Sequence, residues 1–293
     1  MRPVIGVIGG SGLYELEGIE SVEEVWVDTP FGRPSDTLIH GFLPGPRGAT
    51  ELFFLPRHGR GHRLSPSDVP FLANIWALKQ VGVQQVLSIS AVGSLREEIR
   101  PGDLVTVDSF FDRTKRGPWS FFGTGLVAHV GFADPVCGRL RGQLTAAARR
   151  VGATVHDGGT YLCMEGPAFS TRAESRVYRS WGMDVIGMTN LPEAKLAREA
   201  ELCFATLALA TDYDCWHETE ADVSVDSVVA ILRQNSLTAK QIVRELAISL
   251  GDERDCGCGE ALANAILTQP AAIDPGMRDK LGLLVAHRLP AHP

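Results

Sequence analysis

The chain has 293 residues, 44% hydrophobic and 22% charged, which is typical of a globular protein and excludes disordered, collagen-like and fibrous classes. Its 28 Lys and Arg against 35 Asp and Glu give a formal net charge of -7. This acidic balance disfavours sequence-independent nucleic-acid binding, which requires a basic field that displaces counterions.

The N-terminal residues 1–10 contain an apolar run that is too short for the core of a secretory signal. The longest uninterrupted apolar runs, such as residues 207–210, are far short of the ~20 residues of a membrane-spanning helix. We therefore expect a cytoplasmic protein without a transmembrane segment.

Short runs rich in apolar and β-branched residues predict strands. Several are almost wholly apolar, which is typical of strands covered on both faces of a sheet. The predicted strands are residues 4–8, 37–39, 51–55, 85–89, 104–107, 160–164, 184–186 and 203–210.

Helical periodicity appears in residues 68–81, 135–151, 171–181, 192–200 and 224–250. Thr171 and Glu174 have the spacing of a capping box, and Pro192 suits a first helical position, where its missing N–H costs nothing. Strands that alternate with helices predict an α/β fold with a largely parallel sheet. With no repeat or linker, we expect a single domain, residues 1–293. Residues 251–259 read as a polar connector before a peripheral C-terminal helix, which would be suited to act as a lid.

The cysteines do not form the disulfide framework of a small secreted protein, and we expect most of them to be buried thiols. The Cys256-Gly257-Cys258 motif fits a redox pair, half of a metal site, a local disulfide or two free thiols. Because no second pair of this kind completes a four-ligand zinc site, the sequence predicts no metal. The six cysteines are Cys137, Cys163, Cys203, Cys215, Cys256 and Cys258.

Small or cationic residues follow three predicted strands. The turn Gly9-Gly10-Ser11-Gly12 allows backbone N–H groups and the Ser11 hydroxyl to converge on an anion, although a merely tight turn is the alternative. The cationic side chains of the segment Pro56-Arg57-His58-Gly59-Arg60-Gly61-His62 either face a bound anion or form a solvated basic turn. Residues 88–94 add further hydroxyls and glycines. Three such strand ends together indicate one oxyanion site.

Two carboxylates, Asp212 and Asp214, follow the apolar strand 203–210. If the extended conformation persists, both point to the same side. Mutual repulsion in a half-buried pair would then raise the pKa of one carboxyl and suit it to general acid catalysis. Metal binding and simple loop capping are the alternatives.

The ordered motifs resemble the S-methyl-5'-thioadenosine phosphorylases, a family of the trimeric purine nucleoside phosphorylases. The resemblance extends from about residue 6 to residue 250. It implies a single α/β domain with a mixed, partly barrelled sheet flanked by helices, assembled as a homotrimer or a dimer of trimers. The matching motifs are Gly9-Gly10-Ser11-Gly12, Thr29-Pro30-Phe31-Gly32, Pro56-Arg57-His58-Gly59-Arg60, Ala73-Asn74-Ile75-Trp76-Ala77-Leu78, Gly93-Ser94-Leu95-Arg96, Glu165-Gly166-Pro167, Ser170-Thr171-Arg172-Ala173-Glu174, Gly187-Met188-Thr189 and Thr211-Asp212-Tyr213-Asp214-Cys215-Trp216.

The resemblance also implies which residues form the site. Phosphate would be held by Ser11, Arg57, His58, Ser90, Ala91 and Thr189. The base, ribose and 5'-substituent would contact Met188, Phe169, Ile186, His62, Val225 and Val228, with His129 supplied by an adjacent subunit. No cofactor is implied, because inorganic phosphate is a co-substrate.

The implied reaction is phosphorolysis of S-methyl-5'-thioadenosine, in which phosphate stabilises and traps a ribosyl cation. Asp212 would protonate purine N7, and Asp214 would accept a hydrogen bond from the 6-amino group or orient its neighbour. One departure is Ala168, where many relatives have arginine, and it either loosens substrate discrimination or reflects a solvent-facing position.

Three alternatives remain at this point: a broader purine nucleoside phosphorylase, a hydrolytic nucleosidase and a catalytically silent purine-binding protein. A nucleosidase would not need the complete set of phosphate donors. Intact Asp212, Arg57 and His58 disfavour the silent protein.

Overall fold

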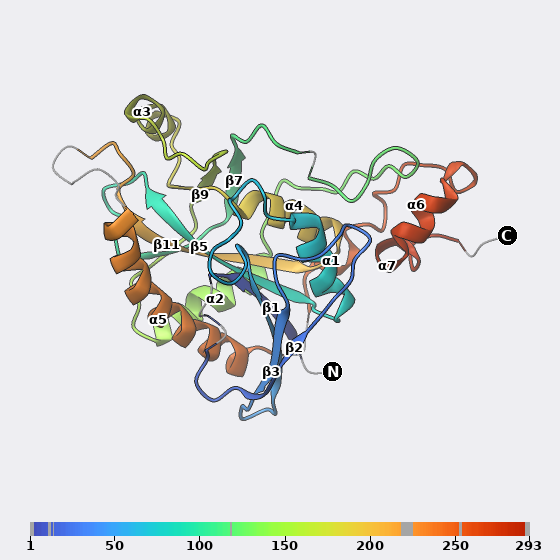
Figure 1. Cartoon of the computed structure of the whole chain (residues 1–293), viewed down its shortest axis with the longest axis horizontal. Coiled ribbons are helices and arrows are strands. Elements are labelled where there is room, and N and C mark those ends of the chain that lie inside the picture. The colour runs from blue at the N-terminus through green and yellow to red at the C-terminus, as the bar shows by residue number, and fades with distance from the viewer. Residues whose placement is uncertain are drawn as a thin grey trace.

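One mixed sheet organises the molecule (Figure 1). The computed structural model describes residues 3–10, 13, 15–117, 119–217, 225–251 and 254–290, without the side chains of 225–230. Within these residues the strands are β1 (Val4–Gly9), β2 (Glu20–Val25), β3 (Leu38–Leu43), β4 (Thr50–Pro56), β5 (Gln85–Ser94), β6 (Leu104–Thr106), β7 (Ser109–Asp112), β8 (Val155–Asp157), β9 (Thr160–Cys163), β10 (Val185–Gly187) and β11 (Cys203–Asp212).

The long strand β5 is where this sheet branches. The order β2-β3-β4-β1-β5-β10-β9-β7 forms the main path, and β11, β6 and β8 form a second arm from β5. The two arms meet again away from β5, because the parallel pair β6–β8 continues in the same register into the pair β7–β9, and the Asp108 N–H donates to the Gly159 carbonyl at 3.2 Å between them. The sheet is therefore partly barrelled, as predicted. The pairing is mixed: β1, β4, β5 and β11 run parallel, whereas β10 pairs with β5 in the antiparallel direction.

One edge of β5 changes partner along its length. Strand β1 pairs with it as far as Ser88, and β10 joins it only at Gly93, while β11 follows the opposite edge throughout. Among the described strands, residues 89–92 therefore have no partner on the first edge. Ligands of open α/β sheets bind where the strand order changes, so this interruption is where a site is expected.

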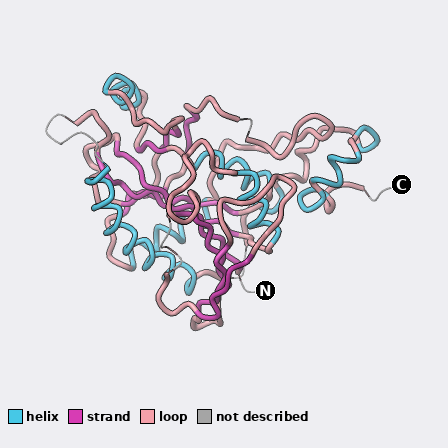
Figure 2. Tube along the Cα trace, viewed as in Figure 1, coloured by secondary structure: helices cyan, strands magenta, loops and turns pink. Residues whose placement is uncertain are grey.

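Helices cover both faces of the sheet (Figure 2). Successive strand residues point to opposite faces. Val7 and Phe54 accordingly pack in the cluster formed with α2 and α5, whereas Ile8 and Phe53 pack in the cluster formed with α1 and α4. The helices are α1 (Phe71–Gln80), α2 (Gly138–Arg150), α3 (Arg172–Ser180), α4 (Asn190–Glu199) and α5 (Val225–Ser249).

The C-terminal segment is part of the core rather than peripheral, which corrects our expectation. It contains the short 3-10 helices η1 (Gly257–Glu260) and η2 (Pro270–Ala272) and the helices α6 (Pro275–Lys280) and α7 (Gly282–Val285). Leu262, Leu281 and Leu284 are buried in the same cluster as α1 and α4. The segment is polar on average, so its composition predicted a peripheral position. The few apolar residues spaced along it were the only sequence signal that it packs against the core.

All the predicted strands and helices are observed, with shifted boundaries. The predicted strand 85–89 continues to Ser94, and Pro192 is the third residue of α4 rather than the first, still within the turn whose N–H groups lack helical partners. The capping box is confirmed, since Thr171 Oγ1 accepts the Glu174 N–H at 3.2 Å and Glu174 Oε2 accepts the Thr171 N–H at 2.8 Å. None of the described helices combines the length and the apolar character that crossing a membrane requires.

Three strands escaped prediction, namely β2, β7 and β8. Strand β2 is mostly exposed and has glutamate at three of its six positions, and β7 and β8 contain only four and three residues. Such strands form because neighbouring strands offer backbone hydrogen bonds, and their own sequences carry little apolar periodicity. The antiparallel pairs among β2, β3 and β4 make the sheet mixed, as the family resemblance implied. The alternation of strands and helices alone had predicted a largely parallel sheet.

Candidate active site

Arg57, directly after β4, forms a buried ion pair with Glu193 of α4. Arg57 is 3% exposed and Glu193 is fully buried. The guanidinium donates from Nε to Glu193 Oε1 at 2.5 Å and from Nη2 to Oε2 at 3.1 Å. It also donates to Ser88 Oγ at 2.6 Å and to the Ile89 carbonyl at 2.9 Å. Since arginine has five N–H donors, one is left for a ligand.

Ser88 and Asn190 complete a closed network around this ion pair. Ser88 Oγ lies 2.6 Å from Glu193 Oε2, and Asn190 Nδ2 donates to Ser88 Oγ at 2.7 Å. The network joins the end of β4 and the start of α4 to β5 at Ser88 and Ile89, where the unpaired stretch of β5 begins. Sequence reasoning singled out Arg57 but missed Glu193 and Asn190, because their side chains meet Arg57 and Ser88 across more than a hundred residues of chain.

His58 is held in one tautomer. Its Nδ1 lies 2.9 Å from the Leu64 carbonyl, which only accepts, so Nδ1 carries the hydrogen and Nε2 is the nitrogen that can change protonation. The ring stacks on His62 with centroids 4.3 Å apart. Burial, together with the charge of Arg57, lowers the pKa of His58 to about 4. The imidazole is therefore neutral near pH 7 in the absence of an anion.

The remaining predicted phosphate ligands lie at neighbouring strand ends. Ser90 and Ala91 lie in the stretch of β5 that has no partner strand on one edge. Ala91 is exposed to solvent. Thr189 is the N-cap of α4, but its side chain makes no capping hydrogen bond. The N-terminus of a helix favours a bound anion. At the N-terminus of α4, the hydroxyl of the buried Thr189 is a further possible donor to such an anion. Ser11 lies outside the described residues, although the Arg57 N–H donates to Gly9 at the end of β1 at 2.9 Å.

Gly93 of β5 brings the purine-side residues together. In the sheet it is paired with Asp212 on one edge and with Ile186 on the other. A Cβ at this position would lie 3.0 Å from Asp212 Oδ1, 3.1 Å from Ile186 Cγ2 and 3.3 Å from the Asp214 Cβ. The absence of a side chain therefore permits these three residues to approach one another. The extended conformation on which the prediction for Asp212 and Asp214 rested does not persist, because β11 ends at Asp212 and Asp214 has a φ of +51°.

Burial raises the pKa of both carboxyls, Asp212 and Asp214. The predicted direction is thus observed, but the predicted cause is secondary, because the charge of Asp214 contributes less to Asp212 than burial does. Asp212 accepts from Thr211 Oγ1 at 2.7 Å and from the Asp214 N–H at 2.8 Å. The Oδ2 atom of Asp214 is buried without a hydrogen-bond partner. Such an acceptor is costly unless it finds a donor. The hydroxyls of Ser170 and Ser175 face this carboxyl and act to lower its pKa, against the larger effect of burial.

Met188 is positioned by a close approach of Gly166. Gly166 has a φ of +66°, and a Cβ there would lie 2.5 Å from Met188 Sδ. Arg116, which sequence reasoning missed, donates from Nη2 to the Met188 carbonyl at 2.6 Å and pairs through Nε with Glu165 at 3.1 Å. Arg116 thereby ties together the two segments that carry Met188 and Gly166.

Two predicted substrate contacts, Phe169 and His62, are open to solvent in the single chain. Phe169 is 53% exposed, and His62 is also exposed. Ala168 is exposed as well, which favours the solvent-facing interpretation of its departure from the arginine of many relatives.

His129 belongs to a different part of the chain surface. It is exposed, and its N–H donates to Ala265 at 2.8 Å in a segment that runs beside the C-terminal region (Figure 1). Val225 and Val228 begin α5, but their side chains lie outside the described residues.

Comparison with known proteins identifies the family of the chain. Residues 4–248 match the Phosphorylase superfamily. A protein named S-methyl-5'-thioadenosine phosphorylase from Geobacter sulfurreducens is 57% identical, over 97% of this chain and 99% of its own. The chain belongs to the S-methyl-5'-thioadenosine phosphorylase family. A member of that family from Koribacter versatilis is 53% identical, over 97% of this chain and 96% of its own.

Solved structures of the family have the same fold. A methylthioadenosine phosphorylase from an antarctic soil metagenomic library has a TM-score of 0.91 at 44% identity, covering 97% of this chain and 99% of its own. The methylthioadenosine phosphorylase from Schistosoma mansoni in complex with adenine has a TM-score of 0.82 at 34% identity, covering 97% and 98%. The predicted membership of this phosphorylase family and its α/β fold are confirmed.

Proposed function

We propose that the protein converts S-methyl-5'-thioadenosine and inorganic phosphate into adenine and 5-methylthioribose 1-phosphate. The observation that carries this proposal is the buried pair Asp212 and Asp214, with raised pKa values, beside Gly93 at the interruption of the sheet. A carboxyl that retains its proton more readily than an exposed aspartate suits a general acid. The family relatives support the same substrate.

In the proposed reaction, the C1'–N9 bond breaks while a phosphate oxygen bonds C1'. Positive charge develops on the ribosyl group, and phosphate offsets it. Asp212 gives its proton to N7, so that adenine leaves without a negative charge. The Asp214 carboxyl, which also faces the hydroxyls of Ser170 and Ser175, would accept a hydrogen bond from the 6-amino group.

Phosphate would be held by the remaining N–H of Arg57, by His58, by the hydroxyls of Ser11, Ser90 and Thr189, and by the Ala91 N–H. The bidentate pair with Glu193 orients the guanidinium before phosphate arrives. Preorganised donors of this kind cost no rearrangement during the reaction.

A homotrimer, or a dimer of trimers, would complete the site. Phe169 and His62 are exposed in the single chain, so a neighbouring subunit has room to cover them. The exposed His129 is proposed as the contact that reaches into the neighbour's site. The cytoplasmic location, and a reaction that needs no cofactor, stay predictions.

The decisive assay measures adenine release from S-methyl-5'-thioadenosine with and without phosphate, beside adenosine and 5'-methylthioinosine. We expect strictly phosphate-dependent release that favours the methylthio adenine substrate. Equal release without phosphate would indicate a nucleosidase. Preference for the inosine analogue would contradict the roles of Asp212 and Asp214, and no release would favour a silent purine-binding protein.

Asp214→Asn should weaken the preference for adenine over hypoxanthine nucleosides by about 5- to 150-fold, the effect of leaving one buried polar group unpaired, ~1–3 kcal/mol. The asparagine amide can turn its NH₂ toward a 6-carbonyl, which the carboxylate cannot do. The ratio of kcat/KM for S-methyl-5'-thioadenosine and 5'-methylthioinosine measures the effect. An unchanged ratio would show that the 6-position is recognised elsewhere.

Anion binding should be accompanied by proton uptake at His58. Its pKa of about 4 leaves Nε2 unprotonated at pH 6, and a bound dianion raises that pKa by favouring the imidazolium. Sulfate is the suitable probe because it remains a dianion at this pH. We expect uptake approaching about one proton, measured by calorimetry in buffers of different ionisation heat.

His58→Asn should abolish this uptake, whereas His62→Asn, which changes the stacked neighbour, should retain it. Loss of uptake in the His62 variant alone would reassign the titrating group.

A further inference from the structure

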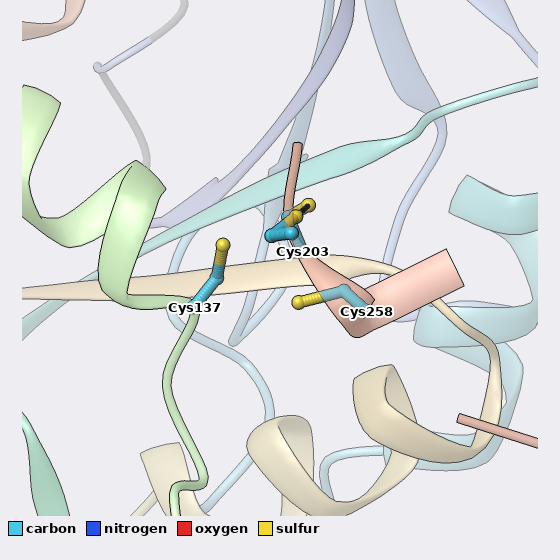
Figure 3. A group of neighbouring side chains, drawn as sticks. Cys137, Cys203 and Cys258 are labelled. Carbon is cyan, nitrogen blue, oxygen red and sulfur yellow. Dashed lines mark hydrogen bonds between the residues drawn. The ribbon is translucent and has the colours of Figure 1, made fainter. Parts of the chain in front are cut away.

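Four cysteines from three separate segments meet at the end of the sheet opposite the active site. The Sγ atoms of Cys137, Cys203, Cys256 and Cys258 all lie within 4.8 Å of one another. Figure 3 shows Cys137, Cys203 and Cys258 pointing into a common space between α2, β11 and η1. Cys137 precedes α2, Cys203 begins β11, Cys256 is the N-cap of η1 and Cys258 lies within η1.

The spacing of these sulfurs suits a single tetrahedral ion. A Zn–S bond of about 2.3 Å places the four sulfurs of a tetrahedron about 3.8 Å apart. The Sγ–Sγ distance between Cys203 and Cys256 is 3.4 Å, and no pair in the cluster exceeds 4.8 Å. A disulfide would require about 2.05 Å, and all four thiols are free in the structure.

Two arginines supply the charge that such a site needs. One divalent ion with four thiolates has a net charge of two negative units. The Nε atoms of Arg139 and Arg254 are both buried without a hydrogen-bond partner. Arg139 lies beside Cys203 and Cys256, and the charge of Arg254 acts on Cys203. Arg139 has one distant carboxylate neighbour, Asp255 Oδ1 at 3.6 Å, whose side chain is mostly exposed.

We propose that Cys137, Cys203, Cys256 and Cys258 bind one structural Zn²⁺ ion. Binding replaces four thiol protons with four Zn–S bonds and releases the protons to solvent, without a change in redox state. Arg139 and Arg254 then donate Nε–H groups toward the metal-bound thiolates. The sequence argument against a metal considered only paired cysteines, whereas the fold adds two single ones.

The position of the cluster indicates a structural role. Four protein ligands leave no open position for substrate. Cys203 and Asp212 lie at opposite ends of β11, roughly 30 Å apart at about 3.3 Å per residue. The ion would fasten the connector of the C-terminal segment to β11 and to the start of α2.

The test uses the full chain, purified under reducing conditions without a chelator from zinc-supplemented cultures. Elemental analysis should give about one zinc per chain, and cobalt substitution should give the intense thiolate-to-cobalt charge-transfer band and visible bands of a tetrahedral four-sulfur site. Cys258→Ser should lose most of the zinc, whereas the control Cys163→Ala, at a buried cysteine of β9 outside the cluster, should retain it.

Removal of zinc should lower Tm and leave kcat on S-methyl-5'-thioadenosine nearly unchanged, and added zinc should restore Tm. Wild-type protein without zinc or a four-sulfur cobalt spectrum would overturn the proposal, as would iron in place of zinc. Disulfides among these cysteines under the same reducing conditions would also overturn it. The wild-type metal content and cobalt spectrum decide the question even if Cys258→Ser fails to fold, and neither depends on turnover.

Discussion

Replacement of Asp212 by alanine is expected to lower kcat on S-methyl-5'-thioadenosine by about 10²- to 10⁴-fold, the usual contribution of a positioned general acid. The physical reason is that adenine would then have to leave as an anion. The folded state should be retained, because Asp212 ends β11 and makes only local hydrogen bonds, to Thr211 and to the Asp214 N–H. Phosphate-saturated turnover and the unfolding midpoint are the two measurements.

An N7-methylated substrate separates acid catalysis from a merely structural role. Its purine is already cationic and leaves as a neutral base without protonation. Wild type and Asp212→Ala should therefore cleave N7-methylated 5'-methylthioadenosine at similar rates, although they differ by orders of magnitude on the natural base. An equal loss of kcat on both substrates would mean that Asp212 positions the purine and does not protonate it.

The purine side of this site was largely predictable from sequence because its signals are local. Asp212 and Asp214 lie at the end of the apolar run that forms β11. Residues at the carboxyl end of a strand lie at the edge of the sheet where ligands bind. The same holds for Arg57 after β4 and for the capping box before α3. Each of these predictions needed only the residues within one element.

The parts that escaped prediction depend on contacts between distant segments. Glu193 reads as an ordinary charge in the first turn of a helix, and only the packing of α4 against β5 places it against Arg57. The branch of the sheet was hidden for the same reason, since the change of partner along β5 is set by where β1 ends and β10 begins. Single cysteines at 137 and 203 carry no spacing signal either.

Glu193→Gln is expected to lower the free energy of unfolding by about 3–5 kcal/mol, the cost of leaving a buried charge without its partner. The substitution preserves the shape of the side chain but removes the charge opposite Arg57, which is 3% exposed. A glutamine can accept from only one of the two guanidinium nitrogens that now bind the carboxylate at 2.5 and 3.1 Å. Equilibrium denaturation at pH 7 measures the change.

Glu199→Gln is the matched control, because it makes the same change in the same helix without a buried cation. Glu199 accepts from Ser120 Oγ and the Phe121 N–H, each at 2.7 Å, and burial raises its pKa to about 7. Its neutral form is therefore already well populated at pH 7, and a neutral amide should cost only about 1 kcal/mol, the net contribution of an ordinary hydrogen bond. Equal losses in the two variants would show that burial of α4, and not the charge of Arg57, determines the effect. A loss of several kcal/mol confined to Glu193→Gln would establish that the arginine facing the proposed phosphate site is held in place by a carboxylate before any anion binds.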